Sequence, residues 1–274
     1  MFKIIIMALL IFIGMVGYDN ITDKAQPTTT IQQEQQKVSK HEKSAAMALF
    51  TSLLPPKEEW PSPVHKFYLA FNMDEVIDPI RQNPNWTSLD AMSRDIPQAL
   101  IAIEDHAFYN HGAIAVEGIL RAALANINAG EVVQGGSTLT QQFVKNVFLS
   151  HEQSMERKIE EAVLSLMLED NYSKDEILEL YLNTTYFGAG STGIKQASRT
   201  YFGKAPSALT LAEAAVIASL PYAPTSLNPL ENPEGCKKRQ LLVLAAMHKY
   251  GMINQGQLAE AKTEKIRLTN GTVM

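Results

Sequence analysis

One local pattern recurs three times in the second half of the sequence and marks where helices begin. In it, Ser or Thr is followed three residues later by Glu or Gln, and an apolar run with helical spacing comes next. Each side chain can accept a hydrogen bond from the other residue's backbone N–H, which satisfies two of the N–H groups that a helix start leaves free. The three pairs are Thr138 with Gln141, Ser173 with Glu176, and Thr210 with Glu213.

Apolar residues recur every three or four positions after these starts, and strand signals are few and short, so the fold is predicted to be mainly α. The predicted helices run from residue 97 to 104, from 118 to 128, from 137 or 138 onward, from 156 to 170, from 177 to 183, and from 211 to 220. In the helix over 156–170 the predicted core stripe is Ile159, Ala162, Val163, Leu166 and Met167. Glu161 lies off this stripe.

The N-terminus predicts export. Behind Lys3, residues 4–17 are apolar, which is short for a bilayer span of about 20 residues but typical of a signal peptide core or a short signal anchor. We expect residues 1–19 to be a retained signal anchor, with a cleaved signal peptide as the alternative. Residues 20–86 are expected to form a polar tether and a segment rich in Pro, in which 45–84 have no assigned role.

Composition narrows the function. The net charge of −5 argues against a nucleic-acid partner, because affinity for a phosphate backbone needs an excess of Lys and Arg, so an anionic ligand would require a local basic cluster. Cys236 is the single cysteine, which excludes an internal disulfide.

Glu104 and Asp105 follow an apolar helical run and precede Phe108, Tyr109 and His111. A carboxylate at the edge of a packed helix can act as a proton acceptor, because burial disfavours its charged form. The alternative interpretation is an ordinary solvated pair of acids at a helix end.

Residues 135–146 have the composition of an anion-binding helix start, with two glycines, hydroxyl and amide side chains, and Lys145. The alternative is a glycine loop with a good N-cap. Further on, Arg157, Lys158 and Glu161 fall within about one helical turn. They suit either a surface ion pair between Arg157 and Glu161 or a site where Glu161 binds a metal or orients a diphosphate.

Taken together, these segments resemble the motifs of the family 51 peptidoglycan glycosyltransferases. The first three motifs correspond to residues 104–111, 135–146 and 157–161. The remaining two correspond to Ile177-Leu178-Glu179-Leu180-Tyr181-Leu182-Asn183 with the glycine and aromatic residues after it, and to residues 211–229. The resemblance covers residues 95 to 234 and implies a lysozyme-like, two-lobed helical domain, which we expect over 87–262, followed by a tail over 263–274.

The resemblance implies polymerisation of lipid II into glycan strands, with inversion at the anomeric carbon and release of undecaprenyl diphosphate. It implies that Glu104 is the general base and that Glu161 assists departure of the diphosphate, directly or through a bound Mg²⁺ or Mn²⁺. The predicted substrate-binding residues are Ser137, Thr138, Gln141, Gln142, Lys145, Asn146, Arg157 and Lys158. The predicted supporting residues are Asp105, Phe108, His111 and Asn183.

The sequence departs from the family at several positions. An Asp that family members carry soon after the histidine is Ala115 here, and an Arg that grips the diphosphate in many members is Gln153. A neutral amide cannot pair with a phosphate as a guanidinium does. Thr192 and Lys195 also differ from the commoner Tyr and Glu.

Three functions remain open at this point. The first is an active, monofunctional polymerase, because the Ser-x-x-Lys and Lys-Thr-Gly motifs of a transpeptidase do not occur. The second is a weakly active or inactive scaffold, and the third is a lysozyme-like hydrolase. The expected partners are lipid II, the growing lipid-linked glycan, the membrane and other cell-wall synthases. The expected location is the bacterial cytoplasmic membrane, with the catalytic domain on its periplasmic or extracytoplasmic side.

Overall fold

The computed structural model describes residues 68–119, 136–149 and 154–274. The chain divides into two compact units, residues 1–65 and 66–274, and all described residues belong to the second unit. The predicted signal anchor and tether, most of the predicted helix over 118–128, and Gln153 lie outside the described residues. Within the described residues, no helix is both long enough and apolar enough to cross a membrane.

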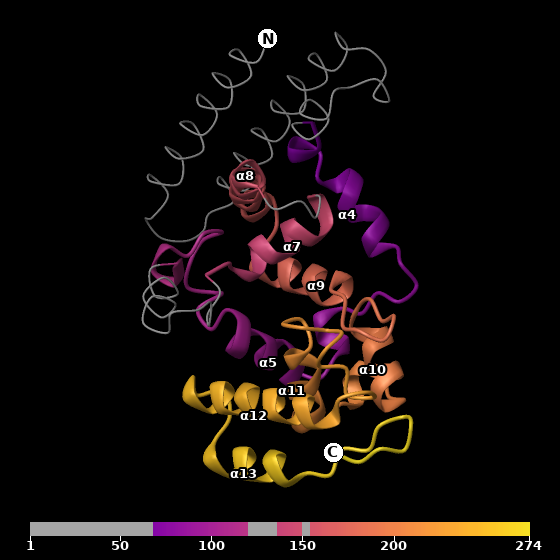
Figure 1. Ribbon diagram of the computed structural model, residues 1–274. Coiled ribbons are helices and arrows are strands. Elements are labelled where there is room, and N and C mark those ends of the chain that lie inside the picture. Colours follow the sequence, from indigo (N-terminus) through magenta and orange to yellow (C-terminus); the bar gives the residue numbers. More distant parts are fainter. Residues whose placement is uncertain (1–67, 120–135, 150–153) are drawn as a thin grey trace. The chain divides into compact units, whose positions relative to one another are not determined.

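The described part of the chain is helical, as predicted, with two isolated β-bridges and no longer strand (Figure 1). The α-helices are α4 (Asp74–Arg81), α5 (Asp95–Glu104), α7 (Leu139–Phe148), α8 (Met155–Asn171), α9 (Lys174–Thr184), α10 (Ile194–Phe202), α11 (Leu211–Ser219), α12 (Pro233–Lys249) and α13 (Gln255–Thr263). Two single-turn 3₁₀ helices are η2 (Leu89–Ala91) and η3 (Pro206–Ala208).

All three predicted capping boxes are present, at the starts of α7, α9 and α11. A fourth, formed by Asn254 and Gln257, opens α13. Each box uses only neighbouring residues, so a helix start can be recognised before its tertiary contacts are known.

The first group of packed helices is α5, α11 and α12, which Figure 1 shows side by side with α13 below α12. Helix α11 is buried along nearly its whole length, from Ala212 to Ser219, because α5 and α12 both pack against it. Helix α5 buries Ile96, Ala99 and Leu100. This packing fixes the position of the C-terminal end of α5.

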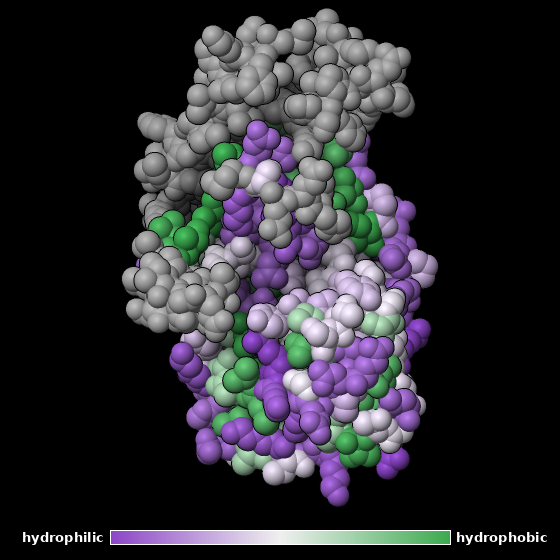
Figure 2. All heavy atoms as spheres, in the orientation of Figure 1, coloured by the Kyte–Doolittle hydropathy of each residue, from purple (hydrophilic) through white to green (hydrophobic). Residues whose placement is uncertain are grey.

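The second group is α7, α8 and α9, with α7 packed against both of the others. The core stripe predicted for α8 is partly wrong. Ile159 and Leu166 are exposed, whereas Glu161 and Ser165 are buried. The buried face of α8 tolerates these polar residues because Ser165 Oγ donates a hydrogen bond to the Glu161 carbonyl, and the Glu161 carboxylate is paired with Lys158. On the face shown in Figure 2, apolar and hydrophilic residues are interspersed.

Candidate active site

Glu104 is the last residue of α5 and is partly exposed. Its Oε2 atom accepts a hydrogen bond of 3.0 Å from Nε2 of Gln142, one turn into α7. The amide oxygen of Gln142 in turn accepts a hydrogen bond of 3.0 Å from the Tyr181 hydroxyl on α9. The end of α5 is thereby connected to α7 and α9 through side chains.

Asp105 follows immediately and makes two separate contacts. Its Oδ1 atom lies 2.6 Å from Nε2 of His111, and its Oδ2 atom accepts a hydrogen bond of 3.0 Å from the backbone N–H of Leu139. The Nδ1 atom of His111 lies 2.6 Å from the Gly112 carbonyl oxygen. The acid therefore fixes both the loop after α5 and the start of α7.

The start of α7 is held by its own side chains. Thr138 Oγ1 accepts the Gln141 N–H and donates to the Ala113 carbonyl at 2.7 Å, while Gln141 Oε1 accepts the Thr138 N–H at 3.0 Å. The Leu139 N–H is already bonded to Asp105. The expectation that this helix start offers several free N–H groups to an anion is therefore wrong, because internal acceptors occupy most of them. Gln141, a predicted substrate-binding residue, is buried and acts as a cap.

Lys158 connects the loop before α7 to the buried face of α8. Its Nζ atom donates to Ser137 Oγ at 3.1 Å and forms an ion pair with Glu161, whose side chain is only 2% exposed. The partner of Glu161 is thus Lys158, so the interpretation as a surface pair between Arg157 and Glu161 is wrong. In the described structure, Nε of Arg157 is buried and has no hydrogen-bond partner.

Three other predicted residues lie apart from this centre. Lys145 and Asn146 are exposed in the second half of α7. Asn183 binds both backbone polar groups of Thr87, with distances of 2.9 and 2.8 Å, and the Glu179 carbonyl. Asn183 therefore holds the segment before α5 against α9 and does not line the cavity described next.

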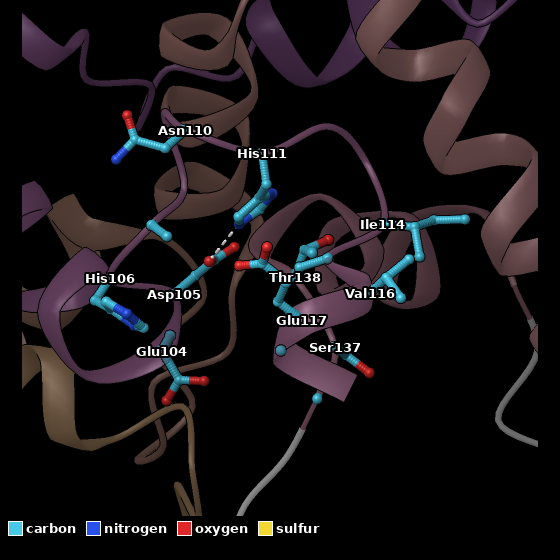
Figure 3. Close-up of a pocket in the computed structure, with 14 residues that line it drawn as sticks. Glu104, Asp105, His106, Asn110, His111, Ile114, Val116, Glu117, Ser137 and Thr138 are labelled. Carbon is cyan, nitrogen blue, oxygen red and sulfur yellow. Dashed lines mark hydrogen bonds and ion pairs between the residues drawn. The ribbon is translucent and has the colours of Figure 1, made fainter. Parts of the chain in front are cut away.

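A cavity of about 390 Å³ lies between the loop after α5 and the start of α7 (Figure 3). Glu104 and Asp105 line it together with His111, Ser137 and Thr138. These five residues, which the sequence motifs assign to one site, thus line one cavity. The cavity has further lining residues that were not predicted as site residues, namely His106, Ala107, Asn110, Ile114, Val116, Glu117 and Gly118. Ala115, the departure noted above, also lines the cavity.

The first turn of α9 supports the loop from the side. Lys174 Nζ lies 4.5 Å from the ring centroid of Phe108, which is fully buried, and Asp175 accepts a hydrogen bond of 2.7 Å from the Tyr109 hydroxyl. Burial raises the pKa of Tyr109, and the hydrogen bond to Asp175 raises it further. Phe108 is thus a packing support, as predicted. The role of α9 was missed, because its capping box says where the helix starts but not what it contacts.

His106 contacts the other group of helices. Its ring stacks on that of Tyr250, just after α12, with centroids 4.2 Å apart and planes 15° apart. Nothing in the sequence pairs these two residues, which are far apart along the chain.

This arrangement suits reactions in which a proton is removed from one group while negative charge develops on another. A carboxylate held by an amide can accept the proton, and a hydroxyl that lines the same cavity, with the ammonium group bonded to it, can stabilise the charge. The geometry of Glu104 suits the first function, and that of Ser137 with its partner Lys158 suits the second.

The fit of a divalent cation rests on Glu161, the predicted metal ligand. The described residues contain no group of three or more His, Cys, Asp or Glu side chains placed to hold a metal ion. One oxygen of Glu161 is already paired with Lys158. These residues do not form a protein metal site by themselves, and Mg²⁺ held by one carboxylate requires further oxygen ligands, such as those of a substrate diphosphate.

Comparison with known proteins identifies similar sequences. The model of a family described as transglycosylase matches residues 73–248. A protein of Cupriavidus necator, described as a candidate transglycosylase, is 41% identical over 194 residues, which cover 71% of this chain and 84% of that protein. Penicillin-binding protein 1A of Neisseria flavescens is 44% identical over 68% of this chain, and penicillin-binding protein 2D of Bacillus subtilis is 44% identical over 66%.

The chain spans only about a quarter of those penicillin-binding proteins, 23% and 26% of their lengths. A solved structure, that of penicillin-binding protein 1A from Haemophilus influenzae, is 33% identical over 48% of this chain and 16% of that one, with a TM-score of 0.34.

Proposed function

The chain belongs to the transglycosylase family, and from this premise we propose that it is a peptidoglycan glycosyltransferase that polymerises lipid II into glycan strands. The observation that carries the proposal is the shared cavity of Glu104 and Ser137. It brings a carboxylate base within reach of the same substrate as the Ser137 and Lys158 donors. The family resemblance supplies the substrate class.

In the proposed reaction Glu104 accepts the proton of the acceptor's sugar hydroxyl. The hydroxyl oxygen attacks the anomeric carbon of the lipid-linked chain, and the bond from that carbon to the diphosphate oxygen breaks. Base and leaving group act on opposite faces of the sugar, so the reaction inverts the anomeric carbon without a covalent enzyme intermediate.

Side chains rather than helix N–H groups receive the departing diphosphate. Ser137 lines the same cavity as the base and accepts a hydrogen bond from Lys158, and Arg157 adds positive charge from α8. Glu161 holds Lys158 in place, which is a role different from direct metal binding. A Mg²⁺ or Mn²⁺ ion, if the reaction uses one, would neutralise diphosphate charge, and its ligands would come mainly from the substrate.

Several features of the proposal rest on the sequence and the family resemblance alone. These are the location at the extracytoplasmic face of the cytoplasmic membrane, the anchor in residues 1–19, and interaction with other cell-wall synthases.

The test is polymerisation of lipid II by detergent-solubilised full-length protein, with and without Mg²⁺. We expect wild type to make polymer and Glu104→Gln to lose at least about 100-fold in rate, because an essential base is removed. Glu260→Gln is the matched control, because Glu260 is an exposed carboxylate on α13. Absence of polymer from wild type would favour the scaffold alternative, and soluble fragments released from purified sacculi would favour a hydrolase.

A further inference from the structure

Gln142 lies between a base and a buried hydroxyl. A carboxylate only accepts hydrogen bonds, so the amide must present its NH₂ group to Glu104, at 3.0 Å. This leaves the amide oxygen in need of a donor. The Tyr181 hydroxyl is that donor, at 3.0 Å. The negative charge of Glu104 therefore sets the direction of both hydrogen bonds that link Glu104, Gln142 and Tyr181.

Tyr181 is suited to be the fixed end of this hydrogen-bond network. Its side chain is only 1% exposed, and it sits on α9, which packs against α7. A ring enclosed in this way has little rotamer freedom, so its hydroxyl stays in one place. Burial raises the pKa of the hydroxyl, and the nearby negative charge of Glu104 raises it further. The hydroxyl is consequently protonated, and available as a donor, at neutral pH.

We propose that Tyr181 is a positioning residue for the proposed base, acting on Glu104 through the amide of Gln142. Donation to the amide oxygen polarises the amide and strengthens its N–H bond to the carboxylate, since linked hydrogen bonds reinforce one another. The inference rests on the proposed function, because it assigns a role in presenting Glu104 to the acceptor hydroxyl.

The two carboxylate oxygens of Glu104 differ in their hydrogen bonds. Oε2 of Glu104 is bonded to Gln142. Among the residues that the structure describes, no hydrogen bond engages the other oxygen, Oε1. Oε1 is therefore the atom that receives the proton of the acceptor hydroxyl. Without Tyr181, the Gln142 side chain loses its anchor and Oε1 is no longer held in one direction.

The first test is Tyr181→Phe, which keeps the ring and removes the hydroxyl. We expect kcat for lipid II polymerisation to fall about tenfold while KM changes less than about twofold, because one hydrogen bond that orients the base is lost and binding groups are untouched. The matched control is Tyr201→Phe. Tyr201 is another fully buried tyrosine, and its hydroxyl donates to the Phe187 carbonyl at 2.8 Å, apart from the cavity. Its removal should lower the melting temperature and leave kcat unchanged.

The second test places Tyr181→Phe in a Gln142→Leu background. If Tyr181 acts only through the amide, the double variant should have the kcat of Gln142→Leu within about twofold. Replacement of Tyr181 by 4-aminophenylalanine, which keeps a donor at the same place, should restore most of the kcat lost in the Phe variant. The 4-aminophenylalanine variant also tests the positioning role of Tyr181 if Tyr181→Phe folds poorly.

Two results would overturn the inference while leaving the proposed function intact. One is a Tyr181→Phe enzyme with the kcat of wild type. The other is equal further loss on adding Tyr181→Phe to Gln142→Leu, which would mean that the hydroxyl acts by another route. A wild-type protein that makes no polymer would instead count against the proposed function itself.

Discussion

Asp105 accepts the backbone N–H of Leu139 at 3.0 Å, so the residue that follows α5 also caps the first residue of α7. Its other oxygen holds His111 at 2.6 Å. One carboxylate therefore joins two helices and the loop between them, next to the proposed base. This relationship gives Asp105 a structural role that differs from the role proposed for Glu104.

Asp105→Ala and Asp105→Asn should differ in stability. Alanine loses both contacts, and we expect the free energy of unfolding to fall by about 2–3 kcal/mol, the range for hydrogen bonds to a charged group. Asparagine can accept the Leu139 N–H and donate to Nε2 of His111, so it should cost about 1 kcal/mol or less. Urea unfolding of the three proteins measures the difference. Equal losses in the two variants would mean that the bridging contacts contribute little.

Replacements of Lys158 and Glu161 should have non-additive effects on the free energy of unfolding, because the two side chains form an ion pair. Lys158→Met leaves a carboxylate that is 2% exposed without its partner, and we expect a loss of about 1–3 kcal/mol. The value is lower than for a fully buried pair because the Lys158 side chain is 46% exposed and screened by solvent. Adding Glu161→Gln should recover part of the loss. A double-mutant cycle by thermal unfolding gives the coupling, and strictly additive effects would contradict it.

Gly193 should not tolerate a side chain. It has φ +84°, and a Cβ atom would lie 2.7 Å from the Asn183 carbonyl oxygen. Gly193→Ala should therefore destabilise the fold by more than about 2 kcal/mol, from backbone strain plus the clash. Gly190→Ala is the matched control, because Gly190 has φ +70° but open space around it. It should cost only the strain, about 1 kcal/mol. Similar melting temperatures for the two variants would argue against the clash.

Cys236 should make stability depend on alkaline pH. Burial raises the pKa of its thiol from 9.0 to about 11, although contact with Ser219 and the charge of Lys237 oppose the rise. The folded state holds this proton more tightly than the unfolded state. Its contribution is therefore complete below pH 9 and is lost as the pH rises through 11.

Cys236→Ala lacks this titration and provides the comparison. The difference in free energy of unfolding between wild type and Cys236→Ala should be constant below pH 8.5 or so, and should shrink above about pH 9. Urea unfolding between pH 7 and about 10.5 tests it. A difference that stays constant over the whole range would show that the thiol does not titrate differently in the two states.

Local sequence signals predicted where helices begin, whereas tertiary contacts determine which face of each helix is buried. The start of α7 could be predicted because Thr138 and Gln141 satisfy each other without help from the rest of the chain. The buried face of α8 was predicted less well. Its apolar positions suggested a stripe through Ile159 and Leu166, but Glu161 is buried because Lys158 and the packed α7 accompany it. An ion pair of this kind allows a charged residue to be buried where hydrophobicity alone predicts exposure.

The candidate site likewise combines residues that sequence motifs indicate with contacts that only the structure reveals. The motif resemblance assigns Glu104, Asp105 and Ser137 to one site, and the structure places all three on one cavity. The contact of Tyr181 with Gln142 spans 39 residues of sequence, and that of His106 with Tyr250 spans still more. Neither has a periodic or local signature, so neither could be found without coordinates.

The end of α5 has an electrostatic consequence for the whole domain. The last turn of α5 carries no basic residue, and the helix ends on Glu104 followed by Asp105. The aligned peptide dipoles of a helix give its C-terminus a partial negative charge, which disfavours an acid there. The proposed catalytic activity is thus obtained at the expense of thermal stability. Glu104→Gln should melt at a higher temperature than wild type by differential scanning calorimetry, and a lower melting temperature would show that the hydrogen bond from Gln142 outweighs the dipole.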